Sequence, residues 1–223
     1  MSLFITFEGC EGAGKTTQLK KAGEFLRRKD IPLLVTREPG GTDLGQELRN
    51  VLLNKSSLNI TVRTEILLFL ADRAQHVGEV IRPALERGVV VLCDRYADAT
   101  IAYQGFGRGC DVEELLGLSN YASQALVPDA TILFDVPPET GIQRVNGRVL
   151  PEDVQEGADR FERERLSFHQ RVREGYLWLA KHEPDRFYVI DGTGSLSDVH
   201  AAVCTTLEAI FRGKNVLSSH FRT

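Results

Sequence analysis

The sequence predicts an α/β fold in which a five-stranded parallel sheet carries helices on both faces. Five short apolar runs alternate along the chain with segments whose apolar residues recur at helical spacing. The runs are apolar throughout and contain many β-branched residues, as is typical of strands in a parallel sheet that is covered on both sides. In such a doubly wound fold, ligands bind at the carboxyl ends of the strands. The runs span residues 3–7, 33–35, 89–93, 130–134 and 187–190, and they end at Glu8, Arg37, Asp94, Asp135 and Asp191.

The composition is that of a soluble globular protein. Of the 223 residues, 26% are charged and 42% are hydrophobic, and the net charge is −4. This balance argues against a nucleic acid or an anionic membrane as the partner. No apolar run approaches the length of a membrane span, and no signal peptide is recognised. The four cysteines form no C-x-x-C pair, so we expect free thiols in a reducing cytoplasm. The chain length fits one domain over residues 1–223.

The first strand is followed directly by a phosphate-binding loop. The run from Gly9 to Thr16 fits G-x-x-x-x-G-K-[ST], and residues 19–26 after it have helical spacing. Glycines let the loop turn its N–H groups toward phosphate oxygens, and the helix N-terminus adds partial positive charge. Lys15 is placed to reach the β- and γ-phosphates, and the Thr16 hydroxyl to bind Mg²⁺. The alternative is a glycine turn without a ligand. The residues predicted to bind ATP here are Gly9, Cys10, Glu11, Gly12, Ala13, Gly14, Lys15, Thr16 and Thr17.

The second and third strands end in polar segments that are candidates for the same site. Pro32 precedes the second strand, and a turn-rich segment over residues 37–42 follows it. Two helical segments lie between Asp43 and Glu86. The third strand ends in Asp94-Arg95-Tyr96. We expect the Asp94 carboxylate near the metal and the Arg95 guanidinium on a phosphate, because arginine binds phosphate with two parallel hydrogen bonds. A surface Asp–Arg pair is the alternative.

A polar segment over residues 147–160 separates a short helix near residues 139–145 from a long helix over about residues 161–182. It contains Pro151 and lacks apolar periodicity, and a loop of this length is usually functional or mobile. Arginines lie at its borders, so we interpret the segment as a mobile lid over phosphates. A solvated loop with ordinary surface arginines is the alternative. The arginines are Arg144, Arg148, Arg160 and Arg163.

Five blocks of the sequence, in the same order, resemble bacterial thymidylate kinases. They are FEGCEGAGKTTQ from residue 7, REPGGT from residue 37, LFLADRAQH from residue 68, DRY from residue 94, and the segment from Thr100 through AYQG at residues 102–105. The resemblance extends to about residue 212. It implies a P-loop NTPase fold of the nucleoside monophosphate kinase type and transfer of the ATP γ-phosphoryl group to dTMP with Mg²⁺. It also suggests a homodimer, formed through the helix around residues 66–70.

The resemblance assigns roles to individual residues. Phe69 would stack on thymine, Arg73 would donate to thymine O4, and Tyr103 would pack beneath the deoxyribose. Without the surrounding block, Phe69 would more readily be interpreted as a core residue. Arg144 would lie against adenine, where a guanidinium plane stacks well. The implied dTMP-binding set is Glu11, Glu38, Phe69, Arg73, Arg95, Thr100, Tyr103 and Gln104; the implied metal set is Thr16, Glu11, Asp94 and Glu162; and the implied catalytic set is Lys15, Asp94, Arg95, Arg148 and Arg160.

The arginine that stabilises the transferring phosphoryl group is expected in the lid. Ala13 stands where some members of the family carry a basic residue, and members without it supply that charge from the lid. Arg148 is our first candidate and Arg160 the second. The segment is longer and more acidic than the short lid associated with this pattern, so the choice between the two arginines stays open.

Three other functions are compatible with parts of the pattern. A kinase for another nucleotide or nucleoside would keep the P-loop and the Asp94-Arg95 pair but change the acceptor pocket. A regulatory ATPase would need a water-positioning residue and switch loops, and no N-K-x-D sequence is present. An inactive binding homologue is disfavoured by intact Lys15 and Thr16.

Overall fold

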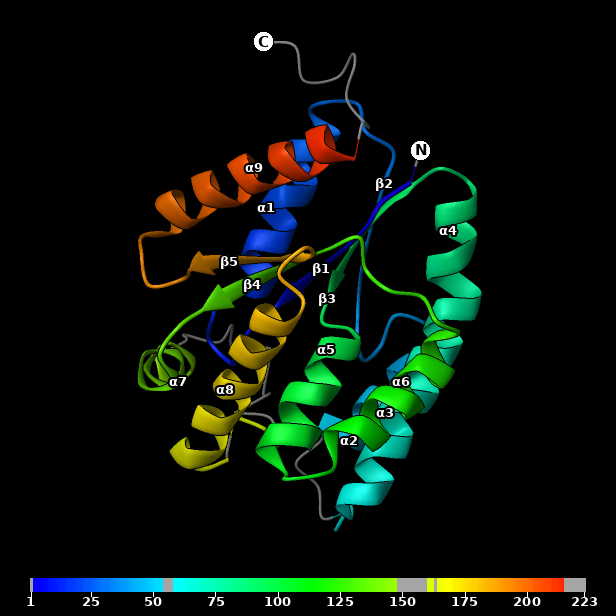
Figure 1. Ribbon diagram of the computed structural model, residues 1–223, viewed down its shortest axis with the longest axis vertical. Helices are drawn as coiled ribbons and strands as arrows, with labels where there is room; N and C mark the ends of the chain where they lie inside the picture. Colours follow the sequence, from blue (N-terminus) through cyan, green and yellow to red (C-terminus); the bar gives the residue numbers. More distant parts are fainter. Residues whose placement is uncertain (1, 54–57, 148–159, 163, 215–223) are drawn as a thin grey trace.

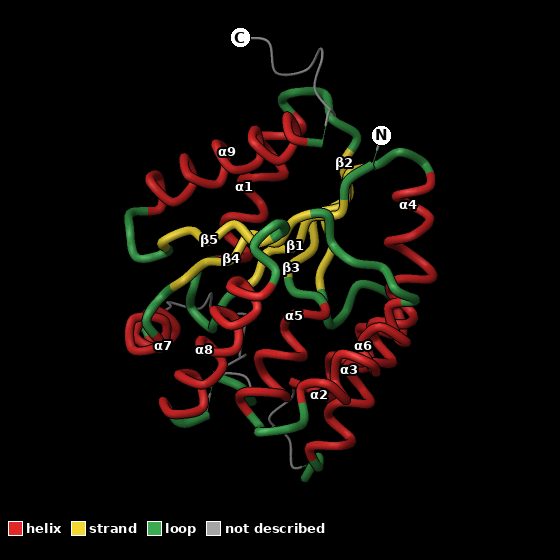
Figure 2. The backbone as a smooth tube through the Cα atoms, viewed as in Figure 1, coloured by secondary structure: helices red, strands yellow, loops and turns green. Residues whose placement is uncertain are grey.

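The computed structural model describes residues 2–53, 58–147, 160–162 and 164–214. Within these residues, five strands form one parallel sheet in the order β2-β3-β1-β4-β5 (Figure 2), which confirms the predicted fold class. Observed strand ends lie within two residues of the predicted apolar runs. The strands are β1 (Phe4–Glu8), β2 (Leu33–Arg37), β3 (Val90–Asp94), β4 (Ala130–Asp135) and β5 (Phe187–Asp191).

The central strand β1 leads into the predicted phosphate-binding loop. It pairs with β3 through Phe7 and Asp94 and with β4 through Glu8 and Leu133. Strands therefore lie on both sides of β1. In such a sheet, ligands bind in a crevice where the connections from two neighbouring strands run in opposite directions. Residues 9–14 lie at this point, at the carboxyl edge of the sheet.

Helices cover both faces of the sheet (Figure 1). On one face, α1 (Lys15–Arg27) and α9 (Leu196–Gly213) pack on Ile5 and Phe7. On the other face, Phe4 packs with η1 (Val77–Ile81) and α4 (Arg82–Glu86). This alternation of Phe4 against Ile5 follows from the two-residue period of a strand. The remaining helical elements are α2 (Asp43–Leu53), α3 (Val62–His76), α5 (Ala97–Thr100), η2 (Ile101–Gly107), α6 (Val112–Ser123), α7 (Pro138–Asn146) and α8 (Leu166–His182).

Local sequence explains where several helices begin. Thr61, Asp111 and Ser195 precede α3, α6 and α9, and each side-chain oxygen accepts a backbone N–H three residues later, at 3.4, 2.8 and 3.2 Å. Such caps satisfy donors that have no partner inside the helix. The segment η2 continues α5 with π-helical hydrogen bonding, which frequently occurs at functional sites. It carries Tyr103 and Gln104.

The predicted start of the long helix near residue 161 is wrong. The helix α8 begins at Leu166, and Arg165 before it has extended backbone angles (φ −66°, ψ 152°). Phe161 instead lies in a turn and is buried, with its ring 5.6 Å from that of Tyr103. The extended backbone at Arg165 precedes the helix, and the Phe161 ring instead packs against η2. Most of the predicted lid, residues 148–159, lies outside the described residues. Nowhere in the described chain is there a helix with the length and apolarity needed to cross a membrane.

Candidate active site

The loop after β1 is pressed against α7. Gly12 has φ +69°, and a Cβ atom there would overlap the carbonyl oxygen of Gly141. Both the backbone angle and the close approach require glycine at this position. Gly14 (φ 89°) precedes the first residue of α1, so the loop delivers its backbone N–H groups to the N-terminus of that helix.

Lys15 points into the loop. Its Nζ donates to the carbonyl oxygens of Gly9 (2.9 Å) and Cys10 (2.7 Å), and its side chain is buried. Burial, together with Arg95, lowers the pKa of Lys15. The ammonium group therefore sits inside the phosphate-binding loop, where a phosphate oxygen could replace the two carbonyls as its partner.

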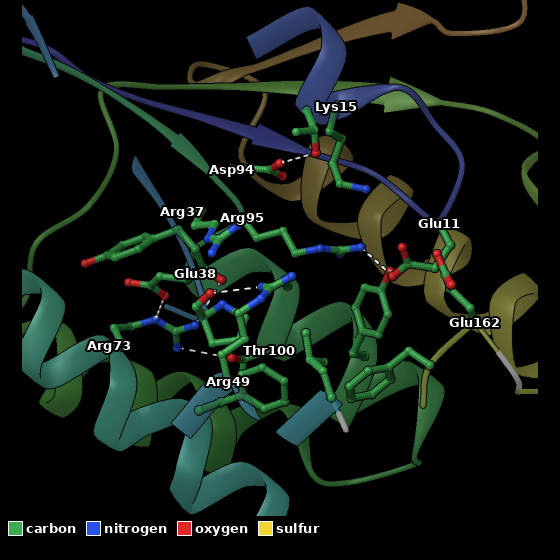
Figure 3. A pocket seen from close by; sticks show the side chains of 18 of the residues that line it. Glu11, Lys15, Arg37, Glu38, Arg49, Arg73, Asp94, Arg95, Thr100 and Glu162 are labelled. Atoms are coloured by element: carbon green, nitrogen blue, oxygen red, sulfur yellow. Dashed lines mark hydrogen bonds and ion pairs between the residues drawn. The ribbon is translucent and has the colours of Figure 1, made fainter. Parts of the chain in front are cut away.

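Thr16 and Asp94, both predicted as metal ligands, lie in contact. The Thr16 hydroxyl donates to Asp94 Oδ2 at 2.6 Å, and both residues line a pocket that extends from the P-loop to Phe69 and Arg73 on α3. A hydroxyl and a carboxylate oxygen fit a hard cation such as Mg²⁺, which usually keeps several waters and binds substrate phosphates rather than a full protein cage. Among the described residues, no group of three or more acidic, histidine or cysteine side chains could hold a metal. The other two predicted metal ligands, Glu11 and Glu162, lie on the opposite side of the pocket (Figure 3).

Arg95 reaches across this pocket to Glu11. Its Nη2 lies 2.5 Å from Glu11 Oε1, and its guanidinium lies over the Tyr103 ring, 4.7 Å from the centroid. Tyr103 Oη donates to the same Glu11 oxygen at 2.9 Å. Burial favours the neutral acid, but Arg95 and Lys15 outweigh it and hold the pKa of Glu11 at about 2. Glu11 is therefore a carboxylate that can accept a hydrogen bond from a ligand.

The backbone of Arg95 is held in an unusual conformation. Arg95 has φ +68°, in the left-handed region, which is uncommon for a residue with a side chain. Glu8 holds the backbone next to Arg95 in place. Its Oε1 accepts from the backbone N–H of Tyr96 at 2.7 Å, and its Oε2 accepts from Tyr176 Oη at 2.8 Å. Burial, and then the Asp98 charge, raise the pKa of Glu8 to about 8. The sequence placed Glu8 at a strand end but gave no sign of its support of Arg95, and it did not indicate Tyr176.

Arg73 is fixed from three directions. Its Nε donates to Glu38 Oε2 (2.9 Å), its Nη1 to Thr100 Oγ1 (3.1 Å) and its Nη2 to the Tyr96 carbonyl (3.0 Å), and 2% of the residue is exposed. Glu38 Oε1 bonds His76 Nδ1 at 3.0 Å. Glu38 lines the pocket, but both of its oxygens are in use, so it holds Arg73 in place. Asp72, next to Arg73, accepts from Gly40 N–H and thereby ties the loop after β2 to α3.

The remaining predicted acceptor residues line the same pocket. Phe69 is partly exposed rather than buried in the core, and its ring lies 6.0 Å from that of Phe161. Gln104 is 2% exposed, and its Nε2 donates to Glu65 Oε1 at 2.8 Å. Thr100 joins them from α5. Sequence reasoning missed Arg49 and Phe161 in this lining and gave no role to Arg37, although Arg37 ends β2.

Arg144 lines a second hollow that also borders the P-loop at Ala13 and Gly14. Its Nη1 donates to the Gly192 carbonyl (2.9 Å) and its Nη2 to the Thr193 carbonyl (3.2 Å). These bonds fix the guanidinium plane beside the hollow. That hollow is lined by Ala13, Gly14, Gln18, Arg144, Gly192, Gly194, Leu196 and Val199.

Of the two candidate lid arginines, Arg160 lies in the described part of the chain. Arg148 lies outside the described residues. Arg160 is described, and its Nη2 lies 2.5 Å from Glu65 Oε2 while its Nε donates to the Leu52 carbonyl at 3.1 Å. In this arrangement Arg160 is paired away from Lys15 and the P-loop.

Known proteins resemble the chain over most of its length. A family model described as thymidylate kinase matches residues 7–203. The thymidylate kinase of Syntrophus aciditrophicus is 49% identical over 212 residues, which cover 94% of this chain and 96% of the relative. That of Nitratidesulfovibrio vulgaris is 51% identical over 209 residues, covering 93% and 97%. A solved thymidylate kinase from Ehrlichia chaffeensis is 33% identical with a TM-score of 0.74, and the match covers 93% of this chain and 98% of that structure.

Proposed function

The chain belongs to the thymidylate kinase family, as an ATP-dependent kinase that phosphorylates dTMP to dTDP, and we propose that the pocket between the P-loop and α3 is where the two nucleotides meet. One observation carries this assignment. A single pocket runs from Lys15 and Thr16 in the P-loop to Phe69 and Arg73 on α3. It therefore joins a phosphate-donor site to a site suited to a flat, polar-edged ring.

The end of the pocket at α3 fits a thymine base. The Phe69 ring offers an apolar face for stacking, and Arg73, held by Glu38, presents a cation near the base edge. Thr100 and Gln104 would bind the remaining edge. Tyr103 would pack beneath the deoxyribose, and Glu11 would accept from its 3′-hydroxyl.

The other end of the pocket concentrates positive charge where phosphates would lie. Lys15 and Arg95 line it with Arg37, which ends β2. A phosphoryl-transfer transition state spreads negative charge over its oxygens, so aligned cations and exclusion of water supply most of the catalysis. The acceptor is already a phosphate oxyanion, so neither a strong general base nor a covalent enzyme intermediate is needed.

The Thr16–Asp94 pair is the proposed Mg²⁺ position. The Thr16 hydroxyl and the Asp94 carboxylate would hold the ion together with ATP phosphates and water. When bound there, Mg²⁺ neutralises charge on the β- and γ-phosphates. Glu11 and Glu162 lie closer to the acceptor side and would act on dTMP or on water that surrounds the metal.

The hollow beside Arg144 is the proposed adenine subsite. The guanidinium is anchored by two carbonyls, which leaves its face for stacking on a purine. We further propose that residues 1–223 form one domain with a lid insertion at about 147–160. Arg148 would then carry the lid's catalytic charge, and Arg160 would do so only if it left Glu65.

We propose that two copies of the chain associate. The helix around residues 66–70 buries Ile66 and Leu70 but leaves Leu67 56% exposed, and the neighbouring α6 exposes Tyr121 to 86% and Leu116 to 43%. These apolar side chains would be covered in a homodimer through α3 and α6. A mass of twice 24.8 kDa in solution would support this assembly, and a monomer at micromolar concentration would exclude it. The free thiols and the net charge of −4 support a cytoplasmic enzyme without membrane or nucleic-acid partners.

The reaction is tested by identifying its products. The protein would be incubated with ATP, Mg²⁺ and dTMP, and the products followed by ³¹P NMR. We expect ADP and dTDP in equal amounts with no inorganic phosphate. Release of inorganic phosphate independent of dTMP would instead show an ATPase.

A further inference from the structure

Glu65 lies directly behind the proposed base-binding residue Gln104. It belongs to α3 and is 1% exposed, and it is absent from the lining of the pocket. Three side chains donate to its carboxylate: Gln104 Nε2 at 2.8 Å, Arg108 at 3.3 and 3.4 Å, and Arg160 at 2.5 Å. The carboxylate is thus bound on both oxygens by three side chains that approach from two other parts of the fold.

Two guanidinium groups compensate the buried charge of Glu65. Arg108 and Arg160 both contact it, and their guanidinium groups lie over the Phe161 ring at 5.6 and 4.9 Å from its centroid. Burial would lower the pKa of Arg108, but Glu65 and Glu164 raise it. A charged carboxylate held in this way accepts hydrogen bonds and donates none.

This chemistry decides which end of the Gln104 amide faces the pocket. The two ends of an amide are interchangeable in shape, and hydrogen-bond partners determine its orientation. Because Glu65 only accepts, the NH₂ group must face it, and the Gln104 carbonyl oxygen is then available to the ligand. The inverted amide would set two acceptors against each other in a buried place, which is costly.

We propose that Glu65 is a positioning residue that selects thymine against cytosine by fixing the Gln104 amide. The inference rests on the proposed placement of the base between Phe69, Arg73 and Gln104. Thymine carries a donor at N3–H, which an amide carbonyl accepts, whereas cytosine carries an acceptor at N3 and would meet that carbonyl unfavourably. A site built around a fixed hydrogen-bond pattern discriminates strongly because the wrong ligand leaves buried polar groups unpaired.

The test is Glu65→Gln, which keeps size and shape but lets the side chain donate. The amide introduced at position 65 can then offer an N–H to the Gln104 carbonyl, and Gln104 can turn its own NH₂ group toward the base. We expect the ratio of kcat/KM for dTMP to kcat/KM for dCMP to fall roughly tenfold or more. The reason is that Gln104 would lose its hydrogen bond to thymine N3–H and gain one to cytosine N3. The preference would not reverse, because Arg73 still favours O4 over an amino group.

Glu164→Gln is the matched control. Glu164 also bonds Arg108, at 2.5 Å, and within the described residues no hydrogen bond joins it to Gln104. The same carboxylate-to-amide change on the same arginine should leave the dTMP-to-dCMP ratio within about twofold of the original, since solvent-accessible ion pairs contribute little. If the dTMP-to-dCMP ratio fell in both variants, the effect would come from Arg108, and the proposed role of Glu65 would be overturned.

A charge exchange keeps the proposal testable if Glu65→Gln does not fold. When Glu65→Gln is combined with Gln104→Glu, the cluster keeps one carboxylate, and the amide introduced at position 65 donates to an acceptor-only partner. We expect the preference of this double variant for dTMP to exceed that of Gln104→Ala. An unchanged ratio in Glu65→Gln, or equal preference in the exchange and Gln104→Ala, contradicts the proposal. A wild-type protein that does not phosphorylate dTMP contradicts the proposed function itself.

Discussion

The hydroxyl of Thr16 in α1 donates to the carboxylate of Asp94 at the end of β3 at 2.6 Å, although the two residues are far apart in the sequence. The parallel pairing of β1 with β3 produces this contact, because Phe7 and Asp94 are register partners at the carboxyl edge. A residue in the first turn of α1 and the last residue of β3 are thus in contact, and the Asp94 side chain lies near Lys15 (Figure 3). In the proposed function, these two oxygens would hold Mg²⁺ beside the P-loop.

Thr16→Val should weaken the use of Mg²⁺. The valine keeps the shape of threonine but removes the oxygen, so we expect the Mg²⁺ concentration for half-maximal rate to rise by about 10–100-fold. Titration of initial rate against Mg²⁺ at fixed ATP measures this. Thr16→Ser should recover most of the loss, and chelation of the metal should abolish turnover. An unchanged Mg²⁺ curve in Thr16→Val would remove Thr16 from the metal site.

Arg95→Lys and Arg144→Lys should separate the two nucleotides. Lysine keeps the charge but loses the planar pair of donors. Loss of a charge-assisted hydrogen bond predicts a roughly 10–100-fold rise in KM for dTMP in Arg95→Lys, and little change for ATP. Arg144→Lys should raise the KM for ATP and leave that for dTMP. Steady-state kinetics with each substrate varied tests the pair, and an effect of both variants on the same substrate would refute the assignment of the two subsites.

Gly12→Ala should disrupt the P-loop more than the core. The new Cβ would overlap the Gly141 carbonyl oxygen at φ +69°, so the loop must move away from α7. We expect ATP affinity to fall well over tenfold, because the backbone N–H groups lose their common direction toward the phosphates. Gly78→Ala is the control, since no atom lies within 4 Å of a Cβ there. Calorimetric titration with ATP should show a defect in Gly12→Ala only.

Stability should depend on pH through Glu8. Burial and Asp98 raise its pKa from an ordinary value of 4.5 to about 8, so the folded protein keeps a proton that the unfolded chain releases. The folded state then binds more protons between these values, and the free energy of unfolding contributed by Glu8 falls as pH rises from about 5 to 8. Glu8→Gln removes this titration. Urea unfolding at several pH values should give a flatter dependence in the variant, whereas parallel curves would show that Glu8 does not titrate in this range.

The fold and the main chemistry were predictable because they depend on local patterns. Strand runs, the loop from Gly9 to Thr16 and the Asp94-Arg95 pair can each be recognised within a few residues. Parallel pairing then brings strand ends together, so their convergence follows from the fold class. The predicted base residues Phe69 and Gln104 line one pocket.

Other features depend on contacts between distant segments and could not be predicted. Glu65 bonds residues 39, 43 and 95 positions away, and no short pattern announces such a cluster. Arg49 lines the pocket from α2, a helix to which the sequence assigned no part in the site. The start of α8 was placed near residue 161 rather than at Leu166, because helical spacing does not reveal the extended backbone at Arg165.

The acceptor preference of the wild-type protein tests the proposed reaction most directly. ADP formation from ATP and Mg²⁺ would be measured with dTMP, dUMP, dCMP, dGMP, dAMP, thymidine or no acceptor. We predict rapid turnover with dTMP, slower turnover with dUMP, and little with the others. Preference for thymidine or for another base would contradict the roles of Phe69, Arg73 and Gln104, and equal turnover without an acceptor would contradict the kinase assignment.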